Sequence, residues 1–106
     1  MYFKHYDAAL GDKIDAATTY SHAAWNAGSG ALATFNTLAD LPNVSVPTLV
    51  VAGDHDIICP PQHGGQRIDS LLPNSELALF ADSGHYPFVE ESDRFFSVLN
   101  DWMGRL

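Results

Sequence analysis

The clearest hydrophobic pattern in the chain is a short, continuously apolar run at residues 47–52, Pro-Thr-Leu-Val-Val-Ala. Its β-branched residues, with proline before and glycine after, predict a strand buried on both faces of a parallel sheet. Residues 76–80 predict a second strand, and residues 66–72 carry a helical pattern between the two. The order strand, helix, strand predicts a right-handed crossover that joins two parallel strands.

A last helix is expected at about residues 93–103. Its apolar positions fall on one side, which suits packing against a sheet face; they are Phe95, Phe96, Leu99 and Trp102.

Ahead of the strands, the alanine-rich run from Asp12 to about Asn26 has apolar residues near helical spacing and predicts another helix. Residues 27–30, Ala-Gly-Ser-Gly, are expected to break it. We expect Ser29 to cap a further helix, Ala31 to Leu41, which Pro42 ends.

Composition places the chain among packed globular proteins, because 46% of its residues are hydrophobic, 17% charged and 11% aromatic. A net charge of -8 repels phosphate backbones and anionic lipid surfaces, so neither nucleic acid nor a membrane is an expected partner. No apolar run approaches the roughly 20 residues of a membrane span, and the first residues lack a signal peptide's apolar centre. The expectation is a soluble, cytoplasmic protein. The single cysteine excludes an internal disulfide and a multi-cysteine zinc site.

Ionisable side chains follow both predicted strands. Asp54 and Asp56 come after the first strand, and His85 comes after the second. Parallel strands joined by one crossover end at the same edge of the sheet, about 4.8 Å apart, so their loops bring a carboxylate within reach of an imidazole. Such a carboxylate fixes the histidine tautomer and stabilises the cation formed when the histidine takes a proton from a nucleophile. Strand position leaves both aspartates open as the acid.

Two motifs surround this strand–helix–strand unit: Gly53–Pro60 reads G-x-x-D-x-x-x-P, and Ser83–Glu90 reads S-G-H-x-P-x-x-E. Over about Val46–Leu106 the chain resembles the C-terminal part of α/β-hydrolases, nearest to proline iminopeptidase-like members. The resemblance implies that Asp56 is the acid of a catalytic triad and His85 its base. Asp54 is then interpreted as a turn residue.

The resemblance also implies how the chain is divided. Residues 44–106 correspond to the C-terminal part of an α/β-hydrolase sheet, a βαβ unit plus the last helix. Residues 1–43 correspond to a helical cap segment, which shapes the substrate pocket in this family. The fold class expected is therefore α/β.

The triad nucleophile, a serine on a G-x-S-x-G turn, has no counterpart in the sequence. Ser21 and Ser29 lack a strand–turn–helix setting and are interpreted as helix-surface and helix-cap residues, and Ser83 as a residue that shapes the turn of His85. Two parallel strands also leave unpaired outer edges. We therefore expect more strands from a nucleophile-bearing N-terminal hydrolase segment or from self-association.

The function implied is a serine hydrolase that acts on a small ester or peptide, without a cofactor. One alternative is metal-assisted phosphoryl chemistry, in which Asp54 and Asp56 hold Mg²⁺. Another is a noncatalytic binding module, or a truncated fragment, that keeps the hydrolase fold without its chemistry.

The remaining candidates are given ordinary structural roles. Glu90 and Glu91 are expected to start the last helix, and Cys59 to be a small packed residue. Surface positions are expected for His5, His22, His55 and His63. Ordinary core positions are expected for Tyr2, Phe3, Tyr6, Trp25 and Phe35.

Overall fold

The computed structural model describes residues 2–5 and 7–106, so Tyr6 lies outside the described residues. The elements, in chain order, are α1 (Ala8–Ala17), α2 (His22–Leu32), the 3-10 helix η1 (Leu41–Asn43), β1 (Thr48–Gly53), α3 (Gly65–Leu71), β2 (Ser75–Phe80), α4 (Pro87–Glu90) and α5 (Ser92–Met103). Among the described residues, every helix falls short of the length and apolar character that a membrane crossing requires.

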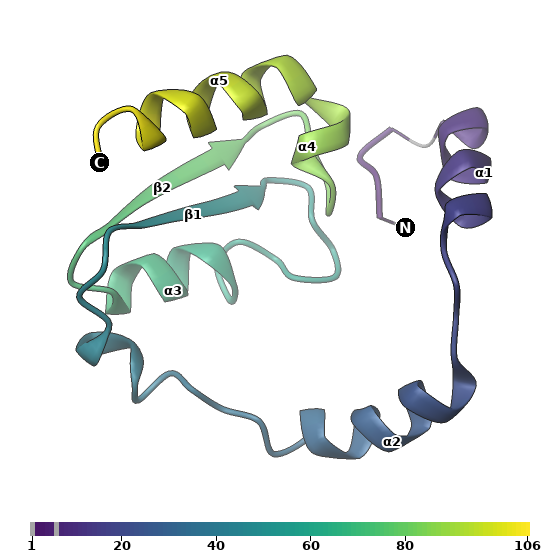
Figure 1. Ribbon diagram of the computed structural model, residues 1–106, viewed down its shortest axis with the longest axis horizontal. Helices are drawn as coiled ribbons and strands as arrows, with labels where there is room; N and C mark the ends of the chain where they lie inside the picture. The colour runs from purple at the N-terminus through teal and green to yellow at the C-terminus, as the bar shows by residue number, and fades with distance from the viewer. Residues whose placement is uncertain (1, 6) are drawn as a thin grey trace.

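The predicted strand–helix–strand unit is confirmed. Strands β1 and β2 pair in parallel, in register from Thr48 opposite Ser75 to Gly53 opposite Phe80. They form a two-stranded sheet within the described part of the chain. Helix α3 covers one face of this sheet and α5 lies along the other (Figure 1). Both strands therefore end at the edge of the sheet where the two motifs begin.

The face of the sheet toward α3 is closely packed. A Cβ on Gly65, the first residue of α3, would lie 2.8 Å from the Cβ of Ala52 and 3.5 Å from Val50. These distances are shorter than or at the limit of ordinary contact, so α3 approaches β1 this closely because Gly65 has no side chain.

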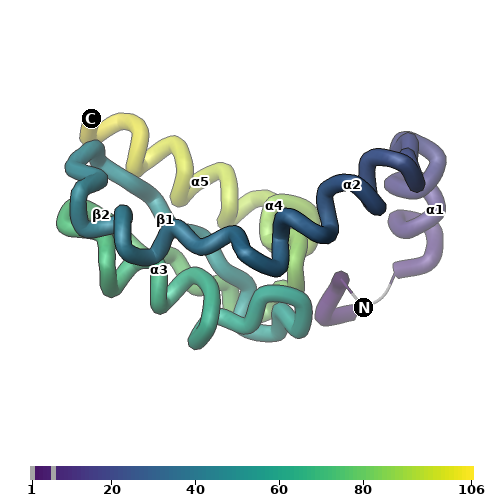
Figure 2. Tube along the Cα trace, turned by 90° about the horizontal axis from the view of Figure 1, so that it is seen from below, coloured from purple at the N-terminus to yellow at the C-terminus, as the bar shows by residue number. Residues whose placement is uncertain are grey.

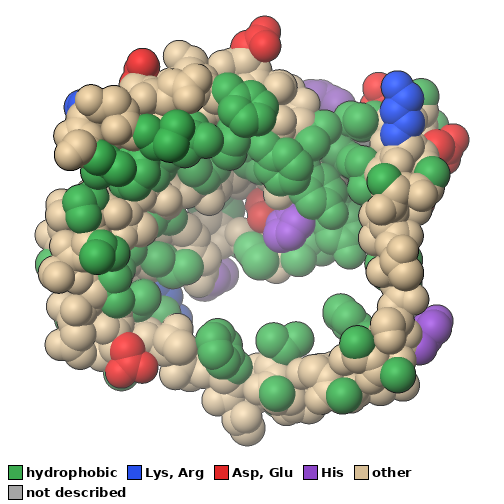
Figure 3. All heavy atoms as spheres, viewed as in Figure 1, with side chains coloured by type: hydrophobic (Ala, Val, Ile, Leu, Met, Phe, Trp, Pro, Cys, Tyr) green, Lys and Arg blue, Asp and Glu red, His purple; other side chains and the backbone are tan. Residues whose placement is uncertain are grey.

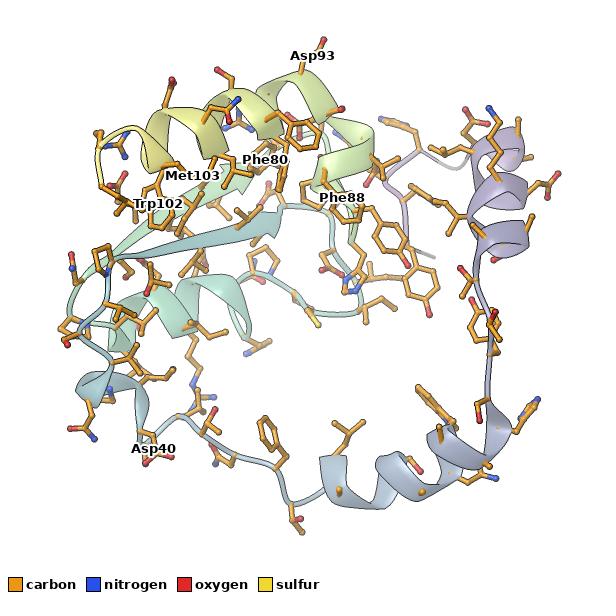
Figure 4. The ribbon with its side chains drawn as sticks, in the orientation of Figure 1. Asp40, Phe80, Phe88, Asp93, Trp102 and Met103 are labelled. Atoms are coloured by element: carbon orange, nitrogen blue, oxygen red, sulfur yellow. The ribbon has the colours of Figure 1, made fainter. Side chains whose placement is uncertain are left out.

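The other face packs against α5 through Phe80, which is fully buried. The Phe95 ring lies 6.0 Å from the Phe80 ring, and the Arg94 guanidinium lies 4.3 Å above it. In Figure 4, Trp102 of α5 and Phe80 of β2 lie between the helix and the sheet, whereas Asp93 of α5 points away from the sheet. The predicted apolar side of α5 is partly wrong, because Phe96 is 50% exposed.

The predicted boundaries of the N-terminal helices are wrong. The expected helix is interrupted at residues 18–21, where the Thr18 hydroxyl donates to the Ile14 carbonyl (2.7 Å) and Ser21 accepts from the Ala24 amide as the N-cap of α2. Ser29 lies inside α2 and caps no helix. Helix α2 continues through Gly28 and Gly30, because each glycine costs a helix only about 1 kcal/mol and the Ser21 cap offsets part of that cost. Pro42 lies within η1 and ends no long helix.

The N-terminal helices extend away from the sheet instead of packing on it (Figures 1 and 2). Figure 3 shows an opening between α2 and the strand–helix–strand unit, with hydrophobic side chains around it. Trp25 and Phe35 are 71% and 70% exposed, so their predicted core positions are wrong. The radius of gyration is 15.7 Å, larger than the roughly 13 Å typical of a compact chain of this length.

Candidate functional site

The loops that follow β1 and β2 cross each other at the end of the sheet. The Asp54 amide donates to the Phe80 carbonyl (2.9 Å), and the His55 amide donates to the Ser83 carbonyl (3.0 Å). A Cβ on Gly53 would overlap the carbonyl of Gly84. The absence of a side chain at Gly53 therefore allows the two loops to approach closely enough for the side chains of Asp56 and His85 to meet.

Asp56 and His85 meet at this crossing. Nδ1 of His85 lies 2.8 Å from Oδ2 of Asp56, which is hydrogen-bond distance. The Asp56 side chain is 9% exposed and that of His85 is 31% exposed. The contact expected from the topology of the two strand ends is therefore present.

The other carboxylate oxygen of Asp56 is held by its own loop. Oδ1 accepts hydrogen bonds from the backbone amides of Ile58 (2.8 Å) and Cys59 (3.0 Å). Burial raises the pKa of Asp56, but these amides and His85 together outweigh burial and hold the pKa below its usual value. Asp56 is thus an oriented, ionised acceptor for the Nδ1 proton of His85.

This arrangement selects one tautomer of His85. When Nδ1 carries the proton shared with Asp56, Nε2 is left as a free proton acceptor. A nucleophile placed at Nε2 would lose its proton to the imidazole, and the Asp56 carboxylate would stabilise the resulting cation. Chemically, the two side chains can serve as a general base with its orienting acid.

The turn that carries His85 is anchored by Glu90 and Glu91. Oε2 of Glu90 accepts from the Gly84 amide (2.7 Å), and Oε1 accepts from the Lys4 amide (2.6 Å). Oε2 of Glu91 accepts from the fully buried Ser83 hydroxyl (2.6 Å) and from the Asp82 amide (3.0 Å).

We expected both glutamates to start the last helix, but Glu90 is the last residue of α4 and only Glu91 directly precedes α5. Their signal in the sequence was the spacing of Glu90, which belongs to the S-G-H-x-P-x-x-E motif. Ser83 does shape the turn of His85, as predicted.

Aromatic side chains surround His85. The rings of Tyr2 and Tyr86 lie 5.7 and 5.3 Å from its imidazole. An open pocket of about 630 Å³ lies beside them, and Asp15 supplies the only carboxylate among its described lining residues. Burial, and then the proximity of Tyr2, Tyr20 and Asp15, raise the pKa of Tyr86, which keeps this wall of the pocket uncharged.

The structure separates the other candidates from this contact. The Asp54 side chain is exposed, and in the described residues Asp56 shares its potential metal-binding cluster with Cys59 and His85, not with Asp54. This mixed set is unlike the all-oxygen sites that Mg²⁺ prefers. Exposed positions are confirmed for His5, His22, His55 and His63.

Cys59 is exposed, so its expected role as a packed residue is wrong. The loop turns around the Asp56 carboxylate and leaves residue 59 outside the core. Ser21 caps α2, and the Ser29 hydroxyl donates to the Asn26 carbonyl (3.3 Å), so both serines have local structural roles.

A protein-family model described as the alpha/beta hydrolase fold matches residues 5–92. A proline iminopeptidase from Clostridium botulinum is 36% identical over 77 residues, which is 73% of this chain and 26% of the relative. A putative carbamate hydrolase from Stutzerimonas stutzeri is 37% identical over 71 residues, 67% of this chain and 26% of that protein. The chain thus spans about a quarter of the length of these relatives.

Solved structures agree with the sequence matches. A thermophilic esterase from Thermogutta terrifontis superposes with a TM-score of 0.62 and 30% identity, over 65% of this chain and 25% of the esterase. The chain therefore belongs to the α/β-hydrolase fold family, and it spans about a quarter of the length of the members it matches.

Proposed function

We propose that the chain carries the acid and the base of a serine hydrolase that cleaves an ester or peptide bond, in the manner of a proline iminopeptidase. The observation that carries this proposal is the 2.8 Å contact between Asp56 and His85 at the ends of adjacent parallel strands. The similarity to an iminopeptidase and to an esterase supports this reaction class.

In the proposed reaction, Nε2 of His85 takes the proton of a serine hydroxyl as the oxygen attacks the scissile carbonyl. The imidazolium then gives that proton to the leaving alcohol or amine. Asp56 stays ionised throughout, which its lowered pKa favours, and holds the ring in the productive tautomer. The acyl group is left as an ester on the serine oxygen. Water then attacks this ester as His85 takes its proton, the carboxylic acid leaves, and His85 returns the proton to the serine oxygen.

The serine is proposed to come from an N-terminal hydrolase segment that packs against this chain. Two features support such a partner: the described sheet has only two strands, and large apolar side chains of α2 and of the segment after it are exposed, namely Trp25, Leu32 and Phe35. Self-association would cover the same surfaces without supplying a G-x-S-x-G serine. The cytoplasmic location and the division at residues 43 and 44 stay predictions.

The pocket beside His85 supports a small substrate with an apolar group. Its aromatic wall contains Tyr2, Phe3 and Tyr20, and its volume is about 630 Å³, within the usual range for small-molecule sites. The proposed substrate places its scissile carbonyl at Nε2 of His85 and its apolar group between these rings.

The test is hydrolysis of p-nitrophenyl acetate and proline p-nitroanilide by the chain in its native assembly. We expect His85→Ala to lower kcat/KM by about 10³-fold or more, because no other group takes its proton-transfer role. His22→Ala is the matched control, since His22 is exposed at the start of α2, and it should stay within about twofold. Equal activity of the two variants would overturn the proposal and favour the noncatalytic binding module.

A further inference from the structure

We propose that Asp56, Cys59 and His85 form a binding site for a thiophilic divalent cation, and that Zn²⁺ is its best-matched ligand. Each residue offers one ligand atom, and the three atoms lie within 4.8 Å of one another. Among the described residues, this is the one group of three or more potential metal-ligating side chains that lie close together.

The loop after β1 places two of the three ligands. Asp56 Oδ1 accepts the amides of Ile58 and Cys59, so the backbone wraps around the carboxylate and brings residue 59 beside it. His85 reaches the same point from the loop after β2, where its Nδ1 contacts Asp56 Oδ2 at 2.8 Å. The backbone thus holds the three ligand residues close together.

The chemistry of the ligands points to zinc rather than magnesium or calcium. Zn²⁺ is bound by thiolate, imidazole and carboxylate groups, whereas Mg²⁺ and Ca²⁺ take oxygen ligands almost exclusively. Bond lengths of about 2.0–2.3 Å place tetrahedral ligand atoms roughly 3.3–3.7 Å apart. The ligand atoms, which lie within 4.8 Å of one another, draw together to reach this spacing, and the exposed position of Cys59 allows its side chain to move.

Binding replaces protons with the metal. The Cys59 thiol releases its proton to solvent as the Zn–S bond forms. The proton of His85 moves from Nδ1 to Nε2 through solvent as the contact with Asp56 opens, so the neutral imidazole offers Nδ1 to the ion and its Nε2 is no longer free to accept a proton. Water would complete the coordination of the metal, because Cys59 is exposed to solvent.

Metal binding has a consequence for the proposed hydrolase, and this consequence rests on the proposed function. An imidazole held by the metal is no longer oriented by Asp56 and cannot serve as the general base. Zn²⁺ is therefore expected to inhibit hydrolysis by competing for His85, and Cys59 is the residue that makes the site selective for thiophilic ions.

The binding test uses the full 106-residue chain and needs no activity. Titration with Co²⁺ should produce a sulfur-to-metal charge-transfer band at one ion per chain, and Zn²⁺ should abolish it. Cys59→Ala should remove the band and weaken Zn²⁺ binding, followed with a chromophoric chelator, by about tenfold or more. His63→Ala, an exposed histidine of the same loop region, should bind as the wild type does.

A second measurement on the unaltered chain guards against misfolding of the variants. Saturating Zn²⁺ should slow alkylation of Cys59 by iodoacetamide by about tenfold or more, and EDTA should restore the rate, whereas Mg²⁺ should have no effect. Unchanged alkylation in Zn²⁺, or equal Zn²⁺ affinity of wild type and Cys59→Ala, would overturn the site.

The activity measurement separates this inference from the proposed function. Zn²⁺ inhibition of the native assembly that is relieved in Cys59→Ala would support both. Zn²⁺ binding at Cys59 without inhibition would leave the site standing and contradict the role of His85 as base. Failure to bind Zn²⁺ would remove the site, while the His85→Ala experiment would still decide the hydrolase.

Discussion

Asp54 and Asp56 are two residues apart on one loop, but they have different surroundings. Asp56 is nearly buried and accepts from two amides and from His85, whereas the Asp54 side chain is exposed. A carboxylate orients an imidazole only when it is itself held in place, so the two aspartates are expected to differ sharply in their effect on hydrolysis.

Asp56→Asn should lower kcat of the native assembly by about 10⁴-fold, because the amide no longer favours the tautomer with a free Nε2. Asp54→Asn removes a charge of the same kind nearby and should change kcat by less than about twofold. Steady-state hydrolysis of p-nitrophenyl acetate at pH 7 compares the two. A similar loss in both variants would mean that the loop's overall charge, and not the contact with His85, matters.

Glu91 is a second residue whose surroundings matter more than its position in the sequence. Its burial raises its pKa, but hydrogen bonds from Ser83, the Asp82 amide and Arg94 outweigh burial, so the pKa lies below its ordinary value of 4.5. A carboxyl group with a lowered folded-state pKa stabilises the fold above its unfolded-state pKa. This stabilisation is lost as the pH falls through the folded-state value.

Glu91→Gln should therefore destabilise the chain by about 1–3 kcal/mol at pH 7, since Arg94 and the buried Ser83 lose a charged acceptor. The difference from wild type should shrink below pH 4.5 as Glu91 itself becomes neutral. Urea unfolding followed by circular dichroism at pH 7, 5 and 3 measures this. Glu76→Gln, which breaks an exposed pair with Arg105, should cost about 0–1 kcal/mol. A difference for Glu91→Gln that grows in acid would contradict the assignment.

At the scale of elements, the site depends on how closely two loops cross. Gly53 ends β1, and a Cβ there would meet the backbone oxygens of Gly84 and, at 2.6 Å, of Ser83. These are backbone atoms that cannot rotate away, so a side chain at residue 53 must displace the turn that carries His85. Gly28, in contrast, lies within α2 with nothing within 4 Å of its Cβ position.

Gly53→Ala should destabilise the chain by about 3 kcal/mol and separate Asp56 from His85. Gly28→Ala should instead stabilise it by up to about 1 kcal/mol, because alanine is the better helix former. Thermal unfolding gives both values, and the His85 ring resonances in an NMR spectrum report the contact with Asp56. A neutral Gly53→Ala would show that the loops can separate without cost.

At the scale of the whole molecule, the chain buries little apolar surface for its length. The described apolar residues that are fully or nearly buried are few, namely Phe3, Val50, Ala52, Pro61, Phe80 and Pro87. Large apolar side chains on α2 and in the segment after it remain in solvent, and the radius of gyration exceeds that of a compact domain. Exposed apolar surface of this kind marks an interaction site.

Native mass spectrometry of the material from its own cells should therefore show the 11.5 kDa chain together with a second polypeptide of about domain size. The fluorescence of Trp25, which is 71% exposed, should shift to shorter wavelength in that assembly relative to the isolated chain. Trp25→Phe is the control that assigns the shift. Detection of the monomer alone, with unchanged emission, would contradict the proposed partner.

The sequence by itself determined the strand–helix–strand unit and the residues at its edge. A continuous apolar run rich in β-branched residues, bounded by proline and glycine, favours a buried strand, and parallel strands joined by one crossover must end together. A contact of His85 with Asp54 or Asp56 was therefore predictable from topology, and the resemblance to α/β-hydrolases selected Asp56. The sequence was less informative for α1 and α2. In residues 7–33 the caps and alanines favour helix and the glycines disfavour it, and these opposing free energies differ by only about 1 kcal/mol.

Only the tertiary structure decided what surrounds the acid–base contact. The loop crossing at Gly53 and Gly84, the anchoring by Glu90 and Glu91, and the exposed Cys59 beside His85 all join residues from different loops or elements. Hydrophobic periodicity reports whether a segment is buried, but not which side chain of another loop it meets. Those contacts depend on differences of a few tenths of an ångström in how closely the backbones pack, and only the folded structure sets these differences.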